Sequence, residues 1–95
     1  SIADLARTAT VLKLLAHPYR LKIVDILESE ASAPVHALVD RLDLPQAAVS
    51  GHLKKMLRVG LVASERRGKE VWYSLGDRRS LTILNCMRAK HGAKP

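Results

Sequence analysis

The stretch LPQAAVSGHLKKMLRVGLV, residues 44–62, decides the fold of this chain. Its apolar residues recur at the spacing of an α-helix and predict a helix over about residues 45–58 with one buried face. The members of that face are Val49, Leu53, Met56 and Leu57. A helix of this kind packs against a core, which leaves its opposite face free for a partner.

The opposite face of this helix combines small residues, polar residues and cations. That combination suits an α-helix that enters the major groove of DNA, with cations on phosphates and Gln46, Ser50 and His52 near base edges. A glycine inside a helix costs about 1 kcal/mol relative to alanine, which close approach to a partner would offset at Gly51. An ordinary amphipathic helix with a solvated basic face is the alternative. The candidate DNA-contacting residues are Gln46, Ala47, Ser50, Gly51, His52, Lys54, Lys55 and Arg58.

The residues that follow predict a β-hairpin, or wing, over about residues 61–76. Gly60 is expected to end the helix, and the segments 61–63 and 71–75 are expected to form the two strands. The polar turn between them carries three cations that are expected to lie along a phosphate backbone or in a minor groove. These cations are Arg66, Arg67 and Lys69. A charged hairpin tip is usually only solvated, but its position directly after the candidate recognition helix favours a DNA contact.

The rest of the chain predicts four more helices around this unit. They cover residues 3–16, 18–27, 34–42 and, after the wing, about 78–91, with a loop at 28–32 and a tight turn at 43–45. The expected fold is mostly α with a small β-hairpin. It is a single winged helix-turn-helix domain over residues 1–95, with four helices, two strands and a fifth helix in that order.

The composition indicates a small basic domain with an aliphatic core. Of its 95 residues 47% are hydrophobic and none is Phe, while a net charge of +7 and a pI of about 10.1 favour a polyanionic partner such as double-stranded DNA. A single Cys excludes an internal disulfide framework and fits a reducing cytoplasm. No apolar run approaches the roughly 20 residues that span a bilayer, and no signal peptide is visible. We therefore expect a cytoplasmic protein with no membrane partner.

The first and last predicted helices carry more apolar residues than a small three-helix core with a wing can cover. We expect a symmetric homodimer in which these helices pack across a two-fold axis. The alternative is that they only cap the core of one copy. The residues concerned are Leu5, Leu12, Leu81, Ile83, Leu84 and Met87. A dimer would place two recognition helices about 34 Å apart, one turn of DNA.

Four segments of the chain form an informative combination: LAHPYRLKI at residues 15–23, LDLPQAAVSGHLK at 42–54, LRVGLV at 57–62 and RRGKEVWYSL at 66–75. Together they resemble the ArsR/SmtB family of bacterial winged-helix repressors. The last two are shared by many winged helices, but the combination is specific. The resemblance implies a homodimer that binds an operator palindrome and is released by an inducer, whose identity the sequence leaves open.

The chain also departs from the family pattern in its recognition helix and at one metal site. Pro45, Ala47 and Gly51 stand where the family usually has Ser, Ser and His, so the base preference should differ. Pro34 and His36 occupy the positions of the family's Cys-x-Cys thiolate site on the preceding helix. A lone histidine at this place is expected to be a surface residue.

The family's other metal site, on the last helices, is also altered. Asp77 is present, but Arg79 and Lys90 replace two histidine ligands, and His91 is one residue out of register. A stable zinc site needs four ligands of N, S or O type, and two cations oppose it. We therefore expect no metal and no other cofactor.

Some relatives sense oxidants through a pair of cysteines, and here Ala16 occupies the place of the first one. Cys86 is the only thiol, which excludes an intramolecular switch. We expect Cys86 to be a small buried apolar residue of the dimer helix. Contact with its copy across the two-fold axis, and hence a thiol-responsive regulator, is an alternative.

Functions from different classes remain compatible with the sequence. The first is a sequence-specific DNA-binding transcriptional regulator, favoured by the small and basic face of the recognition helix. The second is a winged helix whose basic face meets an acidic protein partner. An enzyme is not expected, since no nucleophile–base pair, paired carboxylates or phosphate-binding glycine loop is present, and Ser50 and His52 do not face each other on a helix.

Overall fold

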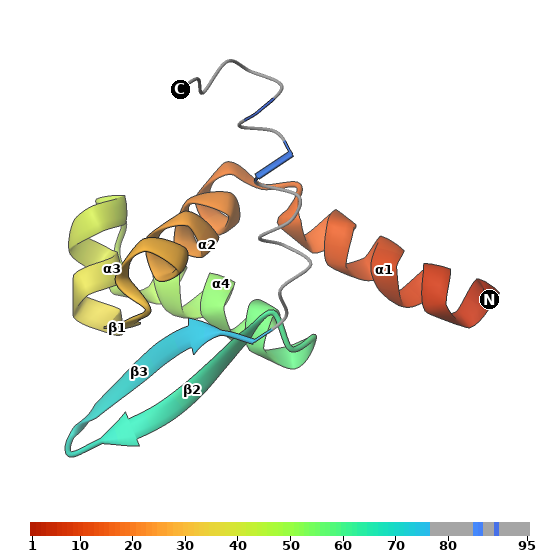
Figure 1. Ribbon diagram of the computed structural model, residues 1–95. Helices are drawn as coiled ribbons and strands as arrows, with labels where there is room; N and C mark the ends of the chain where they lie inside the picture. The colour runs from red at the N-terminus through yellow and green to blue at the C-terminus, as the bar shows by residue number, and fades with distance from the viewer. Residues whose placement is uncertain (77–84, 87–88, 90–95) are drawn as a thin grey trace.

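The predicted helix-turn-helix is formed by α3 (Val35–Leu42) and α4 (Gln46–Arg58), joined by a tight turn (Figure 1). Asp43 ends α3 in the left-handed conformation (φ 55°, ψ 47°), and its N–H donates to the carbonyl of Val39 at 2.9 Å. The carbonyl of Pro45 then accepts hydrogen bonds from the first turn of α4. The structure is a computed structural model that describes residues 1–76 together with 85, 86 and 89.

Two further helices and a hairpin complete the winged helix-turn-helix. They are α1 (Ile2–Leu15), α2 (Pro18–Glu30), β2 (Val62–Arg67) and β3 (Glu70–Leu75). As predicted, α1 ends before His17, and Pro18 is the first residue of α2. The predicted fifth helix at 78–91 lies outside the described residues, apart from residues 85, 86 and 89, which are helical.

The predicted element order is wrong at one place, because a short strand β1 (Ser32–Pro34) precedes α3. It pairs antiparallel with β3, Ala33 opposite Tyr73 and Pro34 opposite Trp72, and the sheet order is β1-β3-β2. The strand forms because β3, which comes much later in the sequence, has an edge available for pairing. Pro34 is tolerated because β1 is an edge strand. The segment was expected to be part of a loop and the start of a helix.

The core is aliphatic, as the composition predicts, and α2 and α4 lie across it. The buried hydrophobic residues are Val11, Leu15, Ile23, Val24, Ile26, Leu27, Ala33, Leu38, Leu42, Val49, Leu53, Met56, Leu61 and Val62. The predicted inner face of α4 is confirmed at three positions but wrong at Leu57, which is 37% exposed. Leu57 sits at the edge of the buried stripe, and no described element covers it from that side.

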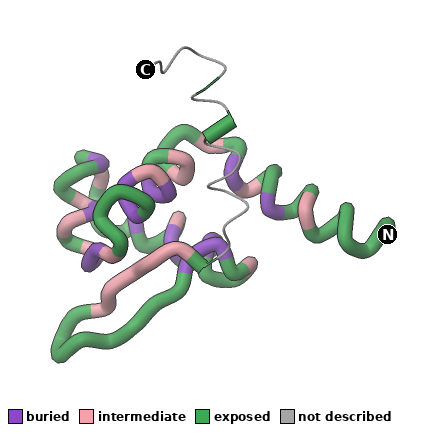
Figure 2. Tube along the Cα trace, viewed as in Figure 1, coloured by how far each residue is buried: buried purple, intermediate pink, exposed green. Residues whose placement is uncertain are grey.

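Helix α1 has two apolar faces, and the described part of the chain buries only one of them. Val11 and Leu15 enter the core, whereas Leu5 and Leu12 are 63% and 45% exposed. The first turns of α1 extend away from the body and are exposed (Figures 1 and 2). Among the described residues, Leu5 and Leu12 therefore do not belong to the buried core. The companion residues expected on the last helix, Leu81, Ile83, Leu84 and Met87, lie outside the described residues.

The end of α4 and the end of the wing are locked together by two glycines. Gly60 follows α4 with a φ of +79°, and its N–H donates to the carbonyl of Leu57. The N–H of Leu61 donates to the carbonyl of Met56. Gly76 donates its N–H to the carbonyl of Leu61 at 2.9 Å. A Cβ at Gly76 would lie 2.6 Å from the carbonyl oxygen of Gly60, so only glycine fits there.

Replacing Gly76 by alanine should therefore destabilise the fold, because backbone rather than a flexible side chain has to move. We expect Gly76→Ala to lower the free energy of unfolding by about 1–3 kcal/mol in urea denaturation. Gly51→Ala is the matched control: a Cβ there meets nothing within 4 Å, and the helix should gain up to about 1 kcal/mol. If Gly76→Ala is as stable as wild type, the end of α4 and the end of the wing are not closely packed.

Candidate nucleic-acid interface

The outward face of α4 is small and polar, as the sequence predicts. With Val49, Leu53 and Met56 buried, seven of the predicted contact residues on α4 are solvent-exposed: Gln46, Ala47, Ser50, Gly51, Lys54, Lys55 and Arg58. Nothing within 4 Å of a Cβ at Gly51 requires a glycine, so internal packing does not explain it. Packing within the described chain therefore does not require the small residue at this position. Its small size allows a partner to approach the helix closely.

The cations of α4 form no ion pair with the described residues. Lys54, Lys55 and Arg58 are exposed, and none forms an ion pair within the part of the chain that the structure describes. Unpaired cations on one helix leave a positive surface that long-range attraction to a polyanion can use. Their arrangement is the one the sequence predicted.

The three cations of the wing differ in the contacts that they make within the hairpin. Gly68, at φ +64°, turns the hairpin beside Lys69, and the guanidinium of Arg66 contacts the Gly68 carbonyl at 3.4 Å. Arg67 is engaged within the wing: it pairs with Glu65 at 3.2 Å, and its guanidinium lies 4.5 Å from the centre of the Trp72 ring. Arg66 and Lys69 are therefore the freer cations at the tip. The sequence did not indicate this cross-strand contact.

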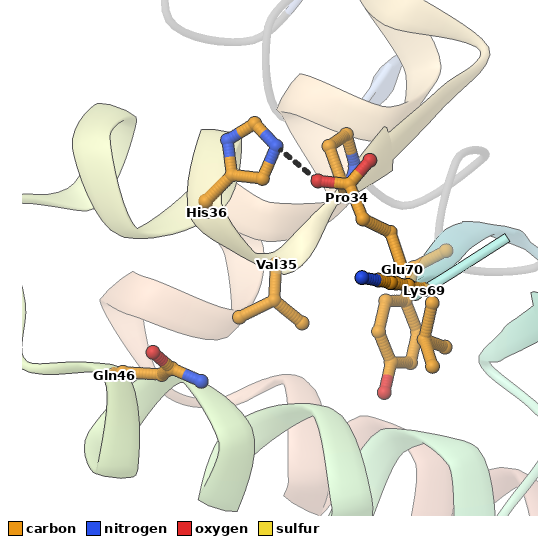
Figure 3. A pocket seen from close by; sticks show the side chains of 8 residues that line it. Pro34, Val35, His36, Gln46, Lys69 and Glu70 are labelled. Carbon is orange, nitrogen blue, oxygen red and sulfur yellow. Dashed lines mark ion pairs between the residues drawn. The ribbon is translucent and has the colours of Figure 1, made fainter. Parts of the chain in front are cut away.

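A hollow of about 310 Å³ separates the start of α4 from the wing (Figure 3). It is lined by Pro34, Val35, His36, Gln46, Lys69, Glu70, Val71 and Tyr73. His36 is a surface residue, as expected, and its Nε2 lies 2.7 Å from a carboxylate oxygen of Glu70. This pair ties the first turn of α3 to β3. Gln46 and Lys69 thus share one continuous surface formed by the recognition helix and the wing.

The side chain of His52 is turned toward the junction of α1 and α2. The Nε of Arg20 donates to its Nδ1 at 3.1 Å, and the His17 ring meets it edge-on with centroids 4.6 Å apart. Burial, followed by the charges of His17, Arg20 and Lys55, lowers the pKa of His52 below its usual 6.5. Because Nδ1 accepts a hydrogen bond, neutral His52 carries its proton on Nε2. No local pattern reveals a contact between residues so far apart in sequence.

The described residues bring no candidate metal ligands together: no three His, Cys, Asp or Glu side chains cluster in that part of the chain. Asp77, Arg79, Lys90 and His91 lie outside it. Cys86 is a free cysteine, and its side chain is exposed in the single copy, so the predicted burial does not hold within one chain. None of the described helices is long and apolar enough to span a membrane.

Comparison with known sequences gives consistent matches over most of the chain. Residues 15–65 match the family described as a helix-turn-helix domain. The HTH-type transcriptional repressor SmtB of Mycobacterium tuberculosis is 48% identical over 74 residues, which are 78% of this chain and 54% of that protein, so this chain spans about half of its length. The transcriptional repressor PagR of Bacillus anthracis is 42% identical, and the match covers 83% of this chain and 79% of the PagR sequence.

Solved structures agree with the fold. NolR from Sinorhizobium fredii has a TM-score of 0.86 at 31% identity, and the match covers 95% of this chain and 89% of the NolR chain. The crystal structure of PagR has a TM-score of 0.82 at 36% identity, with coverages of 92% and 99%. The four described helices and the small antiparallel sheet are therefore those of a winged helix-turn-helix protein.

Acidification should destabilise the protein through His52. Its pKa is below 6.5 in the folded chain, so the unfolded chain binds the proton more readily. The stability that neutral His52 supplies is therefore present above about pH 6.5 and lost as the pH falls toward the lower, folded pKa. We expect His52→Gln to lose less unfolding free energy than wild type between about pH 7 and 5. Identical pH profiles in urea denaturation, or an NMR titration of His52 at its ordinary pKa, would contradict the assignment.

Proposed function

This chain belongs to the ArsR/SmtB family of helix-turn-helix transcriptional repressors, and we propose that it binds DNA in a sequence-specific manner as a homodimeric regulator. The observation that carries the proposal is the outward face of α4. This face is small, polar and cationic, and it carries a glycine that packing does not require. Family membership places the chain among regulators rather than enzymes.

The proposed interface divides into phosphate contacts and base contacts. The cations on α4 and at the wing tip neutralise phosphates, which supplies affinity without sequence preference. Gln46 lies at the N-terminal end of α4, the end that usually enters the major groove, and an amide pairs well with adenine. Ser50 is exposed on the same helix, whereas the Nδ1 of His52 is already occupied by Arg20. Gln46 and Ser50 are therefore the stronger candidates for base contacts.

The proposed dimer rests on the uncovered face of α1. Ile2, Leu5, Ala9 and Leu12 follow one another at spacings of three and four residues, and all four are exposed. That spacing forms the apolar seam of paired helices, and a second copy of the chain supplies the complementary seam by symmetry. Two α4 helices then address two half-sites of a palindrome.

The proposed regulator does not depend on metal. Pro34 and His36 occupy the thiolate positions of the family. Pro34 is the last residue of β1, and the Nε2 of His36 pairs with Glu70. A small-molecule inducer and a thiol response through the exposed Cys86 are the sensing modes that this proposal leaves open. A protein-interaction role for the basic face is the second candidate function, and it predicts no preference for one duplex over another.

Two substitutions on α4 should separate phosphate contacts from base contacts. Lys54→Ala should weaken binding to all duplexes about equally and lower the salt slope of the affinity by about one. Gln46→Ala should instead relax the preference at one base pair of each half-site by about 1–3 kcal/mol. Fluorescence anisotropy with a set of single-base operator variants measures both. A uniform loss in Gln46→Ala would make Gln46 a backbone contact, and no effect in Lys54→Ala would remove Lys54 from the interface.

The dimer is tested by placing charge on the uncovered face of α1. Leu5 is 63% exposed in one copy, so Leu5→Asp should leave the fold intact while burying an unpaired carboxylate in the proposed interface. We expect light scattering to show a dimer for wild type at micromolar concentration and a monomer for Leu5→Asp. Ala3→Asp adds the same charge to the same helix, outside the apolar seam, and should remain dimeric. A monomeric wild type would refute the proposed assembly.

A further inference from the structure

A second hollow, of about 260 Å³, lies where α1, α2 and α4 converge. It is lined by Thr10, Lys13, Leu14, Arg20 and Lys55. Each of the three helices contributes one cation, and no carboxylate lies in this lining. The hollow is distinct from the one beside the wing, since the two linings share no residue.

Arg20 is held in a fixed orientation at this hollow. Its Nη1 donates to the carbonyl of Leu14, and its Nε donates to His52, both at 3.1 Å. A guanidinium has five N–H donors, so three remain for another acceptor. A planar guanidinium that its neighbours already orient loses little freedom when it binds an oxyanion.

Lys13 and Lys55 complete the charged lining. Both are exposed, and within the described ranges neither takes part in an ion pair. The hydroxyl of Thr10 donates to the carbonyl of Ala6, so the free donors come from the three cations. Like charges that converge repel one another, and a bound anion relieves this repulsion.

The lowered pKa of His52 agrees with a positive field at this place. Its pKa is lowered by burial and by the neighbouring charges of His17, Arg20 and Lys55. Two of these residues, Arg20 and Lys55, line the hollow. The same field that disfavours a proton on His52 favours a negative charge beside it.

We propose that the hollow formed by Lys13, Arg20 and Lys55 is an oxyanion site that takes one phosphate-class group. The group comes from the DNA backbone beside the recognition helix or from a free phosphorylated molecule, and the first source rests on the proposed function. An anion at this place bridges α1, the proposed dimer helix, to α4, the proposed recognition helix. Occupancy therefore couples the orientation of the recognition helix to the dimer.

The first arm of the test uses DNA-free protein and inorganic phosphate. In NMR titrations we expect saturable shifts of the Arg20 Nε–H signal and of the amides around Lys55 in wild type. Lys13→Gln should weaken this binding by about fivefold. Lys22→Gln is the control: it removes an equal charge from an exposed residue that pairs with Asp25 at 3.4 Å and lies outside the hollow. It should bind phosphate like wild type.

The second arm measures the salt dependence of binding to duplex DNA. If a backbone phosphate occupies the hollow, Lys13→Gln lowers the slope by about one and Lys22→Gln leaves it unchanged. Weaker phosphate binding with an unchanged DNA slope assigns the hollow to a free phosphate-class ligand. A protein that binds phosphate at the hollow but binds no duplex supports the site while refuting the proposed function. No saturable phosphate binding together with an unchanged slope in Lys13→Gln overturns the proposal.

Discussion

The burial of one face of α4 is the constraint on which the rest of the structure depends. Val49, Leu53 and Met56 are almost fully withdrawn from water, and their removal would cost several kcal/mol each, about 2–5 for a leucine truncated to alanine. Once they are inside, helical geometry determines what points outward: small residues, a hydroxyl and unpaired cations. The proposed interface is thus a consequence of core packing, and the core holds it in place without a partner.

Neighbouring elements connect to this helix at both of its ends. At the N-terminal end, the His36–Glu70 pair joins α3 to the wing around Gln46, and at the C-terminal end Gly60 and Gly76 lock the wing to the helix. Along its flank, Arg20 joins His52 to the carbonyl of Leu14, near the end of α1. These contacts connect the proposed recognition surface to the wing and to α1. The proposed dimer through α1 would therefore set the separation of two α4 helices.

Local patterns in the sequence predicted the four described helices, the wing and the exposure of most of the outward face of α4. Helical periodicity identified the inner face of α4, and Gly60 and His17-Pro18 identified helix ends, because these features act within one or two turns. The sequence did not predict β1, the contact of Arg67 with the Trp72 ring across the hairpin, or the inward turn of His52. Each of these depends on a contact between distant segments or across strands, which periodicity does not encode. Leu57 was misplaced because it lies at the edge of the buried stripe.

Selection from a pool of random duplexes by the wild-type protein tests the central claim most directly. A homodimer that inserts two α4 helices into successive major grooves should enrich a palindrome whose half-sites lie about one helical turn apart. Enrichment should be lost when the salt concentration is raised enough to suppress the phosphate contacts. A pool that stays random after repeated selection at low salt would show that the basic face does not recognise sequence, and would contradict the account.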